Sequence, residues 1–271
     1  MTSWIVPGGI LLVAALVVAR WLWRRNRRKT LLATPLTSWQ RATVEKLVPL
    51  VGRLPEPLRA SLEGKMNRFF DQITFRGING LEVTEEMRLS IAAQACLLIV
   101  NSPAWYDTLR NVLVYPSAFL TDRGTHDGHL IHEGNHATLG ESWARGPVVL
   151  SWDDALHGGL DAGDGHNVVI HEFAHQLDGL SGHVNGIPIL RKGQQYAGWE
   201  QAMLDAYRDH GERLDRGEST LIDPYGATNH QEFFAEAIVT FFEKPRALRD
   251  ERPELYSQLA QLLAIDPAQW R

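Results

Sequence analysis

The sequence predicts a mostly helical α+β domain with a small sheet, preceded by one transmembrane helix at its amino terminus. From about residue 38 onward, apolar residues recur at three- and four-residue spacing, which is typical of amphipathic helices. A few short apolar runs next to glycine or proline indicate strands. Residues 4–19 carry no charge, which favours a membrane segment.

The amino-terminal stretch has the length of a membrane span, since residues 4–23 would rise about 30 Å as a helix. A cleavable signal peptide carries its positive charge before the apolar region, whereas here the charge follows it, so the basic side should stay in the cytoplasm. We expect a single-pass anchor at 1–29, a linker at 30–37 and a cytoplasmic domain at 38–271. An interfacial or core helix is the alternative, because a proline and two glycines interrupt the apolar run. The basic residues are Arg20, Arg24, Arg25, Arg27, Arg28 and Lys29.

Charge and cysteine content exclude some classes of protein. The formal net charge is −5, and residues 1–29 carry six basic and no acidic side chains, so the remaining chain carries −11. Such an acidic domain argues against nucleic acid as a partner. With Cys96 as its single cysteine, the chain has no internal disulfide, and the apolar surroundings of Cys96 indicate a buried thiol.

Five elements are expected before residue 116. The helices cover about Ser38–Leu50, Pro57–Ile73 and Thr84–Val100, and the strands cover Thr74–Gly77 and Asn111–Tyr115.

Two segments follow whose structure is less regular. Residues 120–138 are expected to form a polar loop, and residues 153–167 a glycine-rich one. Between them, Gly146–Trp152 predicts a strand, and the proline at its start fits an edge position. Such an edge can pair with an extended peptide, and an ordinary core strand is an equal alternative.

The strongest chemical signal lies in the apolar stretch Val168–Gly179, which we interpret as the active-site helix of a zinc peptidase. His171 and His175 are four residues apart, so on a helix both imidazoles emerge on one face and can hold one cation. Catalytic zinc keeps three protein ligands and one position for water. Glu172 follows the first histidine and can take a proton from that water without being a ligand.

A second HExxH copy serves as a comparison. His132, Glu133 and His136 have the same spacing, but Gly134 and Asn135 between them are poor helix formers. This copy is therefore expected to be a polar loop rather than a metal site.

The third ligand is not at the position that a metzincin pattern requires, where this chain has Asp178 and Ser181. His183 is two residues off that spacing and is a weak candidate. Asp178 lies three residues after His175, where it is expected to orient a histidine or to cap the end of the helix rather than to bind metal.

A better candidate lies downstream, on an aromatic-rich helix that Asn229 can cap. Glu232 and Glu236 are one turn apart on this helix, and a cation explains the pair, with Glu232 as ligand and Glu236 holding the other ring nitrogen of a histidine. The alternative is that Glu232 only completes a capping box with Asn229.

With these residues, the sequence resembles the Mlc titration factor A family, bacterial zinc-dependent peptidases of the gluzincin kind. It is similar, more distantly, to the catalytic domain of anthrax lethal factor. The resemblance covers about residues 35–265. It rests on His-Glu-Phe-Ala-His-Gln-Leu-Asp at 171–178, Asp-Pro-Tyr-Gly at 223–226 and Glu-Phe-Phe-Ala at 232–235, and more loosely on Gly-Glu-Ser-Trp at 140–143 and on 146–152.

The resemblance implies a zincin-like peptidase fold, with His171, His175 and Glu232 as ligands of Zn²⁺ and Glu172 as general base. Tyr225 matches the tyrosine that in such enzymes can donate a hydrogen bond to the oxyanion, although the sequence alone fits a turn tyrosine equally well. The family it resembles is bacterial, so the anchor expected from residues 1–29 is assigned to a bacterial inner membrane. It also implies an Mlc-like transcriptional regulator as a partner.

Two functions are therefore expected. The first is a membrane-tethered metallopeptidase that acts on peptides or proteins, with aminopeptidase action as one form of that activity. The second is a binding protein, non-catalytic or with a dual function, which sequesters an Mlc-like regulator and in which zinc is structural. Glu172 favours the first, because a purely structural metal site has no use for a base.

Overall fold

The computed structural model describes residues 5–117 and 146–270, with side chains from residue 14 onward. The second HExxH copy at residues 132–136, the predicted loop at 120–138 and the motif at 140–143 lie outside the described residues.

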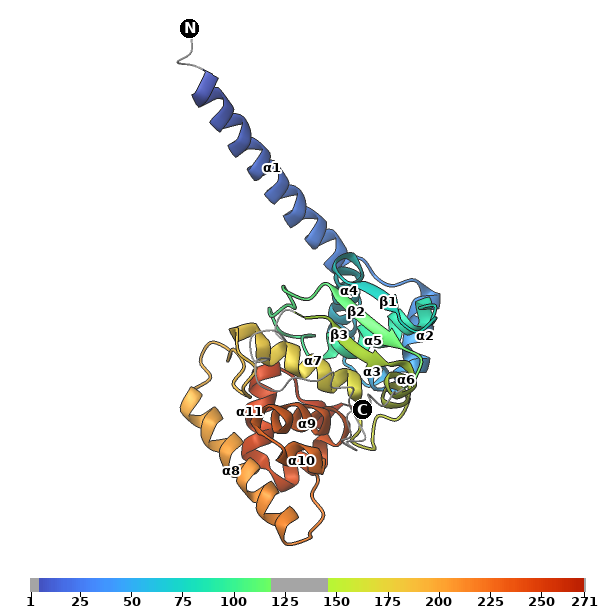
Figure 1. The fold of residues 1–271 in the computed structure, drawn as a ribbon, viewed down its shortest axis with the longest axis vertical. Helices are drawn as coiled ribbons and strands as arrows, with labels where there is room; N and C mark the ends of the chain where they lie inside the picture. The colour runs from blue at the N-terminus through green and yellow to red at the C-terminus, as the bar shows by residue number, and fades with distance from the viewer. Residues whose placement is uncertain (1–4, 118–145, 271) are drawn as a thin grey trace.

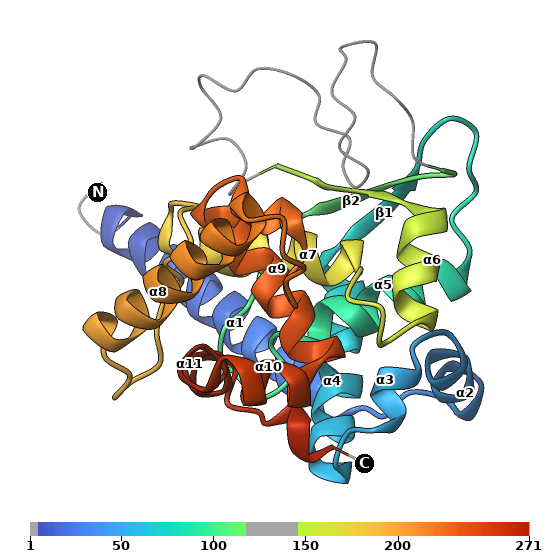
Figure 2. The ribbon, with the colours of Figure 1, turned by 90° about the horizontal axis from the view of Figure 1, so that it is seen from below.

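A three-stranded parallel sheet forms one layer of the domain, in the order β1-β2-β3. The strands are β1 (Thr74–Gly77), β2 (Asn111–Tyr115) and β3 (Val148–Ser151), at the positions predicted from the sequence. Among the described strands, β3 lies at an edge, which agrees with the edge alternative. Figure 2 shows helices α4, α5 and α7 on one side of this sheet.

The helices before the sheet follow the predictions with one break. Helices α4 (Glu56–Gln72) and α5 (Glu85–Leu97) agree with them, and Thr84 caps α5 by accepting a hydrogen bond from Met87 N. The helix expected from residue 38 to 50 is divided into α2 (Ser38–Leu47) and α3 (Pro49–Gly52). Pro49 causes the break, because proline lacks an N–H and disfavours helical geometry in the preceding residue.

The loop predicted over residues 153–167 is wrong in its first half, which forms helix α6 (Trp152–Leu160). Ser151 caps this helix by accepting a hydrogen bond from Asp154 N, and two aspartates in the first turn favour its amino terminus. The glycines that indicated a loop serve close packing instead. A Cβ on Gly159 would lie 2.8 Å from Leu47 O.

The carboxyl-terminal half is helical and packs around α7 (Val168–Asp178) and α9 (His230–Glu243). The apolar residues of both helices belong to one continuous core that reaches from α2 to the carboxyl terminus. Figure 1 shows α8 and the last helices on the side of α7 away from α2 and α3. The other elements of this half are η2 (Gly179–Ser181), α8 (Tyr196–Asp215), η3 (Pro224–Ala227), α10 (Pro245–Glu251), α11 (Pro253–Leu263) and η4 (Pro267–Gln269).

Helix α1 (Ile5–Ala33) extends away from the rest of the molecule in Figure 1. Its last turns pack on α4, where Arg27 Nε donates to Asp71 Oδ1 (2.9 Å) and a Cβ at Gly64 would collide with Leu32 O. Within the described part of the chain, no helix is long and apolar enough to cross a membrane, so the predicted single-pass helix is not confirmed.

The predicted domain boundaries stay a prediction. Helix α1 continues to Ala33, so its last four residues lie in the segment 30–37 that the sequence assigns to a linker.

Candidate metal centre

Helix α7 is fixed at both ends and buried along most of its length. Asn167 caps its amino terminus by accepting a hydrogen bond from Ile170 N (2.9 Å), and Gly179 follows its last residue. Phe173 packs against Phe69 and Tyr106, with ring centroids 5.7 and 5.1 Å away. The opposite face of the helix, which carries both histidines, is thereby turned toward α9.

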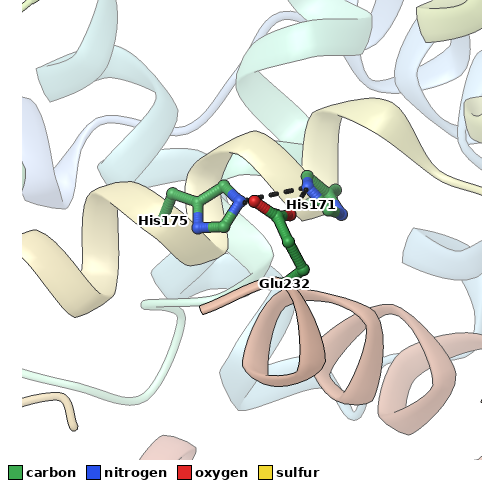
Figure 3. Close-up of side chains that lie close together, drawn as sticks. All are labelled: His171, His175 and Glu232. Atoms are coloured by element: carbon green, nitrogen blue, oxygen red, sulfur yellow. Dashed lines mark hydrogen bonds and ion pairs between the residues drawn. The ribbon is translucent and has the colours of Figure 1, made fainter. Parts of the chain in front are cut away.

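Helix α9 brings the third residue of the site. The side chain of Asn229 caps it by accepting hydrogen bonds from Gln231 N and Glu232 N. Glu232 stands in the first turn, and its carboxylate points at the two histidines (Figure 3). The Glu232 carboxylate is therefore directed into the site. The amino terminus of α9 is capped by the side chain of Asn229.

Three donor atoms form a nearly equilateral triangle. The Nε2 atoms of His171 and His175 are 3.1 Å apart, and Glu232 Oε2 lies 3.1 Å from the first and 3.2 Å from the second. The side chains are 5%, 16% and 10% exposed, so the triangle is open to solvent mainly at His175. Among the described residues, these three are the group of histidine, cysteine and acidic side chains that could hold a metal ion.

Glu236 fixes the orientation of the first histidine. His171 Nδ1 donates a hydrogen bond to Glu236 Oε1 (2.8 Å), which leaves Nε2 as the nitrogen that faces the triangle. A carboxylate on the outer nitrogen of a metal-binding histidine is the usual support for such a ligand. The sequence predicted this arrangement for Glu236.

The acidic side chains around His171 favour a positive charge at the site. Burial alone lowers the pKa of His171, but hydrogen bonds with Glu232 and Glu236 outweigh it and raise the pKa to about 10. Burial raises the pKa of Glu232, whereas hydrogen bonds with both histidines lower it to well below its usual range. Two imidazole nitrogens face each other beside a carboxylate, so a divalent cation in place of the shared protons satisfies all three atoms. The residues present therefore fit a metal ion.

The two predicted catalytic residues stand on α7 and on the short helix η3. Glu172 is buried on α7, three residues before His175 and thus on the same side of the helix, and it is not one of the three convergent donors. The Tyr225 ring lies 6.1 Å from the His171 ring between centroids, on the short helix η3. Tyr225 thus lies beside a proposed ligand, whereas the placement of the Glu172 carboxylate at the site and the roles of both residues stay predictions.

Asp178 serves the loop after α7. It is fully buried, and its Oδ2 accepts hydrogen bonds from Asn185 N and Gly186 N (both 2.7 Å). Burial raises its pKa, and these bonds partly offset the rise. Neither the other oxygen, Oδ1, nor His175 Nδ1 has a hydrogen-bond partner among the described residues. His183 is exposed and stands outside the metal-binding group.

The sequence interpretation assigned no role to Glu243, and it quoted Asp223 only as part of the Asp-Pro-Tyr-Gly motif. Glu243 Oε2 accepts a hydrogen bond from Gly165 N (2.8 Å), which ties the end of α9 to the start of α7. Burial raises the pKa of Glu243 to about 8. Asp223 accepts a hydrogen bond from Tyr225 N (2.8 Å) and so shapes the turn before α9. An aspartate directly before proline is a known turn signal and could have identified this residue.

Comparison with known proteins agrees with this site. The model of a family described as "Glucose-regulated metallo-peptidase M90" matches residues 21–263. The chain belongs to this M90 peptidase family. Among its relatives, the Synechocystis protein slr2042 is 36% identical over 272 residues, which covers 97% of this chain and 98% of the relative. Proteins named Mlc titration factor A from Yersinia pestis and Yersinia pseudotuberculosis are each 32% identical over 253 residues, which covers 92% of this chain and 90% of each relative.

Membership of the M90 family gives the triangle a chemical context. The family is one of metallopeptidases, and the group of His171, His175 and Glu232 is a metal-binding arrangement within the matched range. The expected resemblance to the Mlc titration factor A family is thereby confirmed.

Proposed function

We propose that the chain is a zinc-dependent metallopeptidase that hydrolyses peptide bonds. The observation that carries the proposal is the triangle of His171 Nε2, His175 Nε2 and Glu232 Oε2, with sides of 3.1 to 3.2 Å. Ligands of a tetrahedral zinc ion at about 2.0–2.1 Å lie about 3.3–3.4 Å apart, close to these values. Three protein ligands leave one position for water or substrate, as catalytic zinc sites do. Within this proposal, the domain is zincin-like.

The chemistry divides between the ion and the chain. When bound, zinc would lower the pKa of a water molecule and polarise the scissile carbonyl. Glu172 takes the proton of the attacking water and delivers it to the leaving amine. Tyr225 donates a hydrogen bond to the carbonyl oxygen as that oxygen gains negative charge. Glu236 keeps His171 in the tautomer that presents Nε2.

The Glu172→Gln variant tests this mechanism. We expect it to retain zinc and fold, because Glu172 is not among the convergent donors, and to lose peptide hydrolysis by at least about 100-fold. Zinc content by mass spectrometry and hydrolysis of a fluorogenic peptide library are the measurements. Hydrolysis at the wild-type rate with intact zinc content would remove Glu172 from the mechanism.

Aminopeptidase action is the narrower form of the proposal. A library of peptides with free and acetylated amino termini distinguishes aminopeptidase from endopeptidase action. Hydrolysis of the free peptides alone supports an aminopeptidase, and equal hydrolysis of both supports an endopeptidase.

The second candidate is binding of an Mlc-like transcriptional regulator, supported by the relatives named Mlc titration factor A. If the protein only binds the regulator and is not an enzyme, zinc is structural and Glu172 is not needed for function. Calorimetric titration of a purified Mlc-like repressor into the wild-type protein and into Glu172→Gln tests it. Equal binding by both proteins with no hydrolysis by the wild type supports a binding protein, and no heat of binding rejects this partner.

Attachment to a bacterial inner membrane, with the peptidase domain in the cytoplasm, belongs to the same proposal. Its support is that α1 exposes large apolar side chains next to its basic residues, namely Leu16, Val17, Val18, Trp21, Leu22 and Trp23. Flotation with vesicles of anionic lipid tests it, with a chain that begins after residue 29 as the comparison. Equal flotation of both proteins would reject attachment through α1.

A further inference from the structure

We propose that His166 is a positioning residue, which holds the turn that carries Tyr225 in place relative to the metal-binding helix α7. The inference rests on the proposed role of Tyr225 as a hydrogen-bond donor to the substrate. It concerns a contact between two loops, His166 with Asp223, that lies outside the HExxH motif and outside the metal-binding group.

The contact joins the start of α7 to the turn before α9. His166 Nδ1 lies 3.4 Å from Asp223 Oδ2. His166 directly precedes Asn167, the cap of α7, and Asp223 directly precedes the helix η3 that contains Tyr225. A pair at this position therefore connects the residue before the α7 cap to the residue before the tyrosine helix.

Asp223 determines the conformation of the tyrosine turn. Its Oδ1 accepts a hydrogen bond from Tyr225 N (2.8 Å), and its backbone oxygen accepts one from Gly226 N (3.0 Å). His210 of α8 also makes a hydrogen bond with the backbone of Asp223, which partly offsets the lowering of the His210 pKa by burial. Asp223 is thus held from α8, while its second carboxylate oxygen faces His166.

The loop that carries His166 is itself held in place. His166 N donates to Asp164 Oδ1 (2.8 Å), and Lys244 Nζ donates to Asp164 O (2.6 Å). Gly165 N donates to Glu243 Oε2 (2.8 Å) at the end of α9. A histidine on such a fixed loop can restrain the turn opposite.

Because the side chain of His166 is exposed, its removal can test positioning of the tyrosine turn without unfolding the protein. The side chain of His166 is 44% exposed, and exposed pairs of this kind contribute little to folding. Loss of the imidazole should therefore leave the fold intact and loosen the turn locally. A small displacement of a catalytic group is enough to slow a reaction strongly.

His157 offers a matched control. It is also a histidine with an exposed side chain, and its Nε2 pairs with a carboxylate, Asp164 Oδ2, at 2.9 Å. It stands on α6, and within the described part of the chain its side chain pairs with Asp164 and not with the tyrosine turn. His157→Ala should therefore remove a similar pair that makes no direct contact with the tyrosine turn. Because Asp164 also accepts a hydrogen bond from His166 N, this variant shows how much exchange changes when only the support of the His166 loop is weakened.

The first test needs neither metal nor substrate. Hydrogen exchange by mass spectrometry is measured on chelator-treated wild type, His166→Ala and His157→Ala, for a peptide covering residues 223–229. We expect exchange at the bonded amides of Tyr225, Gly226 and Thr228 to rise several-fold in His166→Ala alone. Equal exchange in all three proteins would overturn the inference, whatever the fate of the proposed peptidase activity.

The second test is a kinetic double-mutant cycle with the zinc-loaded proteins. His166→Ala should lower kcat roughly three- to tenfold with little change in KM, and should have no further effect in a Tyr225→Phe background. An equal fall in both backgrounds would show that His166 does not act through Tyr225, and would overturn the inference. Glu172→Gln tests the peptidase assignment separately, so the two failures are distinguishable.

Discussion

His171 and Glu236 form a buried pair in which Nδ1 of the imidazole donates to a carboxylate oxygen 2.8 Å away. The pair connects α7 to α9 and fixes which nitrogen of His171 faces the other donors. A second helix thus supplies both a ligand, Glu232, and the group that orients another ligand.

Removal of the Glu236 carboxylate should weaken metal binding without abolishing it. We expect Glu236→Ala to lower zinc affinity about 10- to 100-fold, because the outer hydrogen bond raises the basicity of the histidine and fixes its ring. Competition with a chromogenic chelator measures the affinity. Glu236→Gln keeps an acceptor oxygen and should lose less. An unchanged affinity in Glu236→Ala would show that the pair only stabilises the fold.

Glu243 should make stability fall as the pH rises. Burial raises its pKa from 4.5 to about 8 in the folded protein, so its carboxyl stays protonated there while the unfolded chain ionises. Its favourable contribution is complete below about pH 4.5 and is lost as the pH rises toward 8; one pKa unit equals about 1.4 kcal/mol.

Glu243→Gln removes this titration. We expect its free energy of unfolding to exceed that of the wild type increasingly from pH 5 to pH 8, measured by urea denaturation. A constant difference across that range would contradict a raised pKa for Glu243.

Removal of the Asp178 carboxylate should lower the stability of the fold but leave the zinc content unchanged. Asp178→Ala leaves the buried N–H group of Gly186 without its acceptor, which costs about 1–3 kcal/mol, and also removes the acceptor of the part-buried Asn185 N–H. We expect a lower free energy of unfolding and faster proteolysis near residue 185. One zinc per folded chain should remain, and loss of zinc from the folded variant would instead assign Asp178 to the support of His175.

Two glycines should respond oppositely to alanine. A Cβ at Gly64 would collide with Leu32 O, so Gly64→Ala should displace α1 from α4 and lower the melting temperature. Gly211 stands inside α8 with no atom within 4 Å of its missing Cβ, so Gly211→Ala should stabilise by about 0.5–1 kcal/mol. Thermal denaturation measures both, and equal shifts would show that α1 does not pack closely at Gly64.

The sequence predicted the metal-binding elements because their signals are local. Helix α7 has a strong apolar pattern between Asn167 and Gly179, and α9 begins at the expected cap Asn229. The pairing of Glu236 with a histidine was also predicted, since two acids one turn apart on an apolar helix need a partner.

Other features depend on packing that no local pattern records. Helix α6 forms although it contains Gly158 and Gly159, because tertiary contacts with Leu47 and Asn167 require glycine there. The contact between His166 and Asp223 joins residues 57 positions apart and has no periodic signal. The membrane span suggested by the apolar residues at the amino terminus is not confirmed among the described helices.

The most direct test of the metal centre is the zinc stoichiometry of purified wild-type, Glu232→Ala and Glu172→Gln proteins, measured by native mass spectrometry. If two imidazoles and the Glu232 carboxylate hold one ion, the wild type and Glu172→Gln should each carry one zinc per chain, and folded Glu232→Ala should carry far less. A Glu232→Ala protein that binds zinc with wild-type stoichiometry and affinity would contradict this account.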